Sequence, residues 1–98
     1  MSDYLDGVAQ DIRAQVPEPA LPPPGDAPVA LFRIYALLAR AKGEATTLED
    51  VHDAWSVWMG SHDPDHGALV PFGELTTVQQ GQDQPFLDAI HAYARSRR

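Results

Sequence analysis

Apolar residues recur at helical spacing in four stretches of the chain, with proline- and glycine-rich segments between them. Spacings of three and four residues place side chains on one face of an α-helix. We therefore predict helices over residues 1–16, 29–41, 47–59 and 83–94. No alternating pattern indicates a strand, and no internal repeat is present. The predicted fold class is all-α, a small four-helix bundle-like single domain with a long structured loop between its third and fourth helices.

Residues that favour helix ends mark the boundaries of these segments. The predicted N-caps, in chain order, are Ser2 or Asp3, Asp26, Thr47 and Asp83. Asp50 follows Thr47 by three residues, which is the spacing of a capping box. Gly43 and Gly60 are the predicted stops of the second and third helices.

Two segments between the helices have distinct compositions. Residues 17–28 hold six prolines, which favour extended, polyproline-like chain. We interpret this segment as a stiff strap that Leu21 holds against the body, and the alternative is a ligand for another protein's groove. Residues 61–73 form the predicted long loop, with Leu69, Val70 and Phe72 folded back over the core, and residues 76–80 form a short turn.

The charge of the chain narrows the classes of partner. The 98 residues include 14 acidic and seven basic side chains, for a net charge of −7. All of the acids precede Arg95, whereas three of the basic residues lie at positions 95, 97 and 98. An acidic body repels phosphate backbones, so we expect no direct nucleic-acid binding. The acids are spread rather than ordered in rows, which also disfavours an imitation of DNA.

Composition bears on location and origin as well. No apolar run approaches the roughly 20 residues that cross a bilayer, and the N-terminal residues lack a secretory signal pattern. Cysteine is absent, so disulfides and thiolate chemistry are excluded. We expect a cytoplasmic protein with no membrane contact. The excess of arginine over lysine suggests a GC-rich genome, such as that of an actinobacterium or its phage.

Two motifs in the second half of the chain resemble the ryanodine-receptor-type repeat. The first is His52 three residues before Trp55 on a predicted helix. The second is the decapeptide from His66 to Leu75, HGALVPFGEL, followed eight residues later by Asp83. The resemblance covers residues 48–94. It departs from the family's pattern at Gly67 and Phe72, where the family has Pro and Tyr, and in a shorter link between Trp55 and His66.

The resemblance implies a binding module rather than a catalyst. Members of that family resemble nucleotide-responsive regulatory domains, so the implied ligand is a nucleotide-derived small molecule. Its spacing would bring His52, Trp55, Glu74 and Asp83 to one pocket, with His66 locking the loop through Glu74 or a backbone carbonyl. The alternative is that each residue has a structural role: Trp55 fills core, Glu74 accepts backbone N–H bonds and Asp83 caps a helix.

The segment HDPDH, from His62 to His66, holds two imidazoles and two carboxylates, which are ligand types for a divalent metal. Pro64 prevents the helix that would align them, and no second cluster of His or Cys accompanies it. We therefore interpret the segment as a turn-forming loop and predict neither a metal nor a cofactor. No nucleophile motif or glycine-rich phosphate loop is present, so we predict that the protein is not an enzyme.

Aromatic and Met side chains at the end of the third helix are candidates for contact with a protein. Trp58 and Met59, with Phe72 and the acidic flank, form the predicted surface of a protein-interaction adaptor or modulator. Core packing is the alternative for Trp58. The central helix from Val29 to Ala41 is apolar over more than half of its circumference, so neighbours must cover two sides of it. A second copy in a homodimer is one such neighbour.

Overall fold

The computed structural model describes residues 3–22 and 25–97, and every regular element within them is helical. The α-helices are α1 (Tyr4–Gln15), α2 (Asp26–Lys42), α3 (Leu48–His62), α4 (Thr77–Gly81) and α5 (Gln84–Arg95). Single 3-10 turns occur at η1 (Glu18–Ala20), η2 (Gly43–Ala45) and η3 (Phe72–Glu74). The predicted all-α class, with four long helices and a loop between the third of them and the short α4, is confirmed over the described residues.

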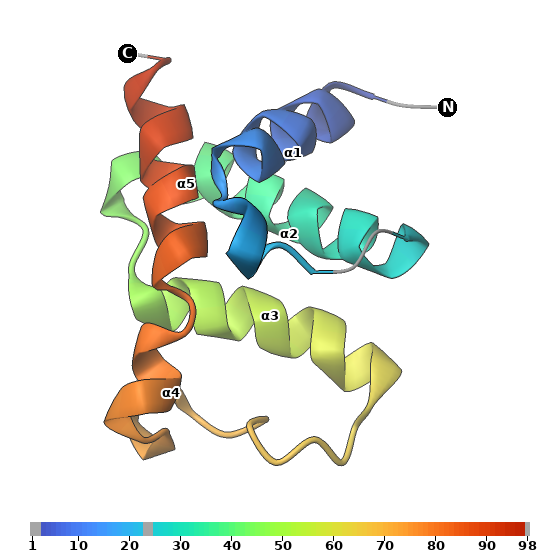
Figure 1. Ribbon diagram of the computed structural model, residues 1–98, viewed down its shortest axis with the longest axis vertical. Helices are drawn as coiled ribbons and strands as arrows, with labels where there is room; N and C mark the ends of the chain where they lie inside the picture. Colours follow the sequence, from blue (N-terminus) through green and yellow to red (C-terminus); the bar gives the residue numbers. More distant parts are fainter. Residues whose placement is uncertain (1–2, 23–24, 98) are drawn as a thin grey trace.

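The helices α1, α2 and α3 are stacked one upon the next, and α5 crosses them at one side (Figure 1). The loop after α3 runs back beneath that helix and leads into α4, which lies at the same side as α5 (Figure 1). Because α5 packs on α1, α2, α3 and η2, it ties the N-terminal half of the chain to the tryptophan-bearing helix.

The hydrophobic core fills the space between these helices. Its largest fully buried side chains are Ile12, Phe32, Tyr35, Val51 and Ile90. The rings of Phe32 and Tyr35 meet edge to face, with centroids 5.8 Å apart, which is a favoured aromatic geometry. Every long helix contributes to this core, so we expect the domain to unfold as one cooperative unit.

The helix caps explain why the elements begin where they do. The side chain of Asp3 accepts a hydrogen bond from the backbone N–H of Asp6, and Thr47 and Asp50 form the predicted capping box. Ser2, the alternative first cap, lies outside the described residues. Gly43 ends α2 with a φ of +55°, a conformation that favours glycine.

Two predicted helix boundaries and the predicted conformation of the strap were wrong. The N-cap of α2 is Gly25, so Asp26 is the first helical residue rather than the cap. Helix α3 continues through Gly60 and ends at His62, because Asp63 precedes a proline and residues in that position avoid the helical conformation. The strap is not extended throughout, since the 3-10 turn η1 begins after Pro17. Pro19 lies in the first turn of η1, where a proline sacrifices no helical hydrogen bond.

The predicted role of Leu21 is confirmed, because this side chain packs against the core from the strap. None of the helices in the described residues combines the length and the apolar character that a bilayer crossing requires.

Candidate functional site

The loop from residue 63 to residue 76 is anchored to α3 by a buried histidine. His52 is 3% exposed, and its Nε2 lies 2.7 Å from the carbonyl oxygen of Val70. A carbonyl oxygen can only accept, so Nε2 carries the proton and donates it. The hydroxyl of Ser56 donates to the backbone carbonyl of His52, 2.8 Å away. His52 therefore has the role of a loop anchor.

Trp55 and His66 extend this contact along the loop. Their ring centroids lie 5.2 Å apart in an edge-to-face arrangement, and the rings of His52 and Trp55 stack at 5.6 Å. The backbone N–H of Ala68 donates to Nδ1 of His66 at 3.1 Å, so that nitrogen carries a lone pair. His66 does lock the loop by hydrogen bonding, but its partner is a backbone amide rather than the predicted Glu74 or a carbonyl.

A cavity of about 260 Å³ opens beside these rings. Its lining residues come from α3, the loop, α4 and the start of α5: His52, Trp55, His66, Ala68, Leu75, Gln79, Gln82 and Asp83. Three of the four residues expected to converge on a pocket are thus brought together. Glu74 is the exception, since it is exposed and does not line the cavity.

Asp83 is the acidic side chain of this cavity. It occupies the N-cap position of α5, as predicted, yet its carboxylate makes no capping hydrogen bond. Burial raises the pKa of Asp83 above its ordinary value, and the nearby His52 lowers it by a smaller amount. The cavity thus holds an acid whose ionised form is poorly solvated.

The predicted protein-contact residues are partly exposed, and Trp58 also has the core contacts of the alternative prediction. Trp58 is half-buried and packs against the core, and its ring lies 4.6 Å from that of His62. Met59 and Phe72 are also half-buried, with the Phe72 ring 6.2 Å from the imidazole of His52. Phe72 therefore helps to seat the loop.

The two histidines of the HDPDH segment have separate partners. Nδ1 of His62 lies 2.7 Å from the carbonyl oxygen of Trp58, whereas His66 contacts Ala68 and Trp55. Within residues 3–22 and 25–97, no three His, Cys, Asp or Glu side chains are grouped so that they could hold a metal ion.

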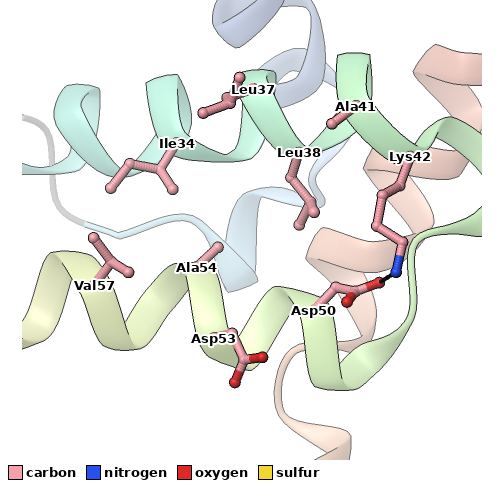
Figure 2. Close-up of a pocket in the computed structure, with 9 residues that line it drawn as sticks. All are labelled: Ile34, Leu37, Leu38, Ala41, Lys42, Asp50, Asp53, Ala54 and Val57. Atoms are coloured by element: carbon pink, nitrogen blue, oxygen red, sulfur yellow. Dashed lines mark ion pairs between the residues drawn. The ribbon is translucent and has the colours of Figure 1, made fainter.

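A second hollow, which the sequence analysis did not identify, lies between α2 and α3. This groove has a volume of about 360 Å³ and is lined mainly by aliphatic side chains. Its lining residues are Ile34, Leu37, Leu38, Ala41, Lys42, Asp50, Asp53, Ala54 and Val57. Figure 2 shows the two helices running antiparallel, with the ion pair between Lys42 and Asp50 at one end of the groove.

Two of the apolar side chains that line this groove, Leu37 and Val57, are largely exposed to solvent. They are 60% and 68% exposed, on opposite sides of the groove. Exposed apolar side chains that gather around a hollow mark contact sites more often than scattered ones do. The sequence signal for this groove was the wide apolar surface of α2. The sequence did not show which part of that surface α1, α3 and α5 would leave uncovered.

Charged side chains around the groove are arranged unevenly. On the α2 side, Arg33 pairs with Asp6 at 2.9 Å and Arg40 lies over the ring of Tyr4, so both are directed toward α1. On the α3 side, Asp53 is exposed and has no ion-pair partner among the described residues. The surroundings of the groove are therefore acidic.

The fold and its two hollows define a small all-α domain with an apolar groove and a separate polar cavity. The chain belongs to the family of the domain of unknown function DUF7701, whose model matches residues 3–95. This match gives no support to the resemblance to the ryanodine-receptor-type repeat over residues 48–94. Neither curated proteins nor solved structures show a significant match to the chain.

Proposed function

We propose that this domain is a non-enzymatic protein-interaction module, and that its groove between α2 and α3 binds a basic amphipathic helix of a partner protein. The observation that carries the proposal is the exposure of Leu37 and Val57 on the two sides of an aliphatic hollow. Burial of apolar surface is the main favourable contribution to association of this kind. A helix that presents apolar residues at spacings of three and four would fit between α2 and α3.

The charge around the groove supports a basic partner. Glu49, Asp53 and Val57 follow one another at spacings of four residues, so they share one face of α3. Lys42 is already paired with Asp50 at 2.7 Å. Lysine or arginine beside the partner's apolar stripe would therefore meet uncompensated acids, and the net charge of −7 would speed its approach. The same charge opposes a second copy of this chain.

A comparison of three variants tests this surface. Leu37→Glu places a charge at the edge of the groove, whereas Val78→Glu makes the same change on α4, where Val78 is 76% exposed. We expect affinity capture followed by mass spectrometry to lose the partner with Leu37→Glu and to keep it with Val78→Glu. Met59→Ala represents the surface predicted from sequence, and loss with that variant alone would move the docking site to the end of α3.

The occupant can be identified by photo-crosslinking from position 57, with position 78 as the control. The expected product joins residue 57 to a partner segment whose lysines or arginines flank apolar residues at helical spacing. A crosslink to a second copy of this chain would make the groove a homodimer interface and contradict the proposed occupant. Equal crosslinking from positions 57 and 78 would remove the groove as the binding surface.

A second candidate function is small-molecule binding in the cavity beside Trp55. The observation that favours it is the gathering of aromatic and polar side chains around one cavity. The resemblance to the ryanodine-receptor-type repeat would make the ligand nucleotide-derived. A thermal-shift series with nucleotides tests this idea, because a ligand at 100 times its Kd adds about 2.7 kcal/mol of stability.

A further inference from the structure

The chemistry of the cavity beside Trp55 indicates which class of small molecule it would accept. Its volume of about 260 Å³ lies below the range of about 300 to 1,000 Å³ that is usual for drug-sized ligands. None of the residues that line it is Lys or Arg, and its acidic group is Asp83. The cavity therefore suits a compact ligand, and its charge disfavours a phosphate.

Asp83 lacks the partners that would normally accompany a half-buried carboxylate. It makes no capping hydrogen bond, and it pairs with no Lys or Arg among the described residues. The basic side chains Arg33, Lys42 and Arg97 are paired elsewhere, with Asp6, Asp50 and Asp11. Buried charges are usually compensated by an opposite charge, and a cationic ligand would supply it here.

His52 and the buried Tyr35 are the titratable groups that interact with Asp83, and neither replaces such a cation. The Nε2–H of His52 is donated to the Val70 carbonyl, and the hydroxyl of Tyr35 carries no positive charge. The charge of His52 lowers the pKa of Asp83 less than burial raises it, so the carboxylate stays under-compensated.

The aromatic wall of the cavity adds a second attraction for cations. Trp55 lines the cavity, where the His52 ring stacks on it with centroids 5.6 Å apart and the His66 ring meets it edge to face at 5.2 Å. The face of an indole ring attracts ammonium groups more strongly than that of any other side chain, and the effect grows when water is excluded. A carboxylate and an indole around one space are the two groups that recognise organic ammonium ions.

We infer that the cavity formed by Trp55, His66 and Asp83 binds a small organic ammonium ion, with its charged head between the Asp83 carboxylate and the Trp55 ring. This inference rests on the second candidate function, that the cavity is a ligand site. It differs from the nucleotide proposal because it assigns the opposite charge to the ligand. The groove between α2 and α3 is not involved.

Isothermal titration of the full chain with choline chloride, in a buffer of matched ionic strength, tests the inference. The uncharged carbon analogue 3,3-dimethyl-1-butanol has the same shape without the charge, and adenosine monophosphate represents the nucleotide class. We expect saturable binding of choline at millimolar concentrations, weaker binding of the neutral analogue and no binding of the nucleotide.

Two variants locate the binding site. Asp83→Asn keeps the shape of the side chain and removes its charge, so we expect it to weaken choline binding by about tenfold. Asp88→Asn makes the same change on an exposed residue of α5 and should leave binding unaltered. Trp55→Leu removes the aromatic face, and its folding is checked by circular dichroism before its affinity is compared.

Each outcome decides between the ideas. Choline binding that is lost with Asp83→Asn and kept with Asp88→Asn supports the inference. Binding of adenosine monophosphate without binding of choline overturns the inference but leaves the cavity as a ligand site. If the three probes all fail to bind the folded protein, both the inference and the second candidate function are rejected, while the protein-interaction proposal is unaffected.

Discussion

The Nε2–H of His52, at the first buried turn of α3, donates to the carbonyl oxygen of Val70, 18 residues later in the chain. This single bond links the tryptophan-bearing helix to the middle of the 63–76 loop. Because the rings of Trp55 and Phe72 both lie close to the imidazole, with centroids 5.6 and 6.2 Å away, the loop is held by packing as well as by hydrogen bonding.

Replacement of His52 by alanine should destabilise the protein and release the loop. The Val70 carbonyl would lose its donor and a small cavity would form, so we expect a loss of about 1 to 3 kcal/mol in the free energy of unfolding. Hydrogen exchange at residues 69–72 should become faster. His62→Ala changes an exposed histidine and should alter stability by less than about 0.5 kcal/mol. Equal effects of the two variants would show that the bond to Val70 contributes nothing.

Core and groove residues should respond differently to truncation. Ile90 is fully buried, so Ile90→Ala should cost about 2 to 5 kcal/mol in urea denaturation. Leu37 is 60% exposed, and Leu37→Ala should change stability by no more than about 0.5 kcal/mol. A large loss with Leu37→Ala would mean that the groove is covered in solution, most simply by a second copy, which sedimentation analysis would detect.

The capping box of α3 provides a test of local helix stability. Thr47→Ala removes the oxygen that accepts from the backbone N–H of Asp50 at 3.1 Å, and such losses cost about 1 kcal/mol. Thr76→Ala removes the equivalent bond of α4 to Gln79. Helix α4 has five residues and none of them is buried, so the second variant should lower the midpoint of thermal unfolding less than the first. The reverse order would show that α4 is needed for global stability.

Asp83 and Asp50 should have opposite effects on stability as the pH changes. Burial raises the pKa of Asp83 in the folded state, so ionisation opposes folding, and this destabilisation grows as the pH rises from below 3.8 through the folded-state value. Asp83→Asn should therefore raise the thermal midpoint at neutral pH and lose that advantage in acid. Asp88→Asn is the control, and a gain of the same size in both variants would rule out burial as the cause.

The hydrogen bond from Lys42 lowers the pKa of Asp50 in the folded state, so ionisation of Asp50 stabilises the fold, in contrast to ionisation of Asp83. That contribution to stability is present above the ordinary value of 3.8 and is lost as the pH falls through the folded-state pKa. Lys42→Met should reduce stability at neutral pH and leave it unchanged in strong acid. The pair is partly exposed, so an effect that persists in acid would reflect lost side-chain packing rather than charge.

Local chemistry was sufficient to predict where most helices begin and end. Capping residues such as Asp3 and Thr47 act through bonds three residues away, so the neighbouring sequence contains all of the necessary information. The exceptions are the start of α2, where Gly25 rather than Asp26 is the N-cap, and Gly60, where α3 continues instead of ending. The return of the loop over the core was predicted from its apolar residues Leu69, Val70 and Phe72, whereas its contact with α3 was predicted only from the resemblance to the ryanodine-receptor-type repeat.

Local sequence patterns did not predict which side chains would remain exposed to solvent. Helical periodicity showed that α2 is apolar on more than half of its circumference, but the packing of α1, α3 and α5 decides that Leu37 remains uncovered. The same holds for Trp58, which core packing makes half-buried, and for Glu74, which the turn at η3 directs to solvent.

The sequence by itself thus determined the helices, their caps and the acidic character of the domain, because these depend on bonds within one turn and on a sum of charges. Only the tertiary structure decided that Glu74 stays outside the cavity lined by Trp55 and Asp83, and that Val57 borders a groove with Leu37. Those relationships join residues far apart in the chain, and they depend on how whole helices pack rather than on any local preference.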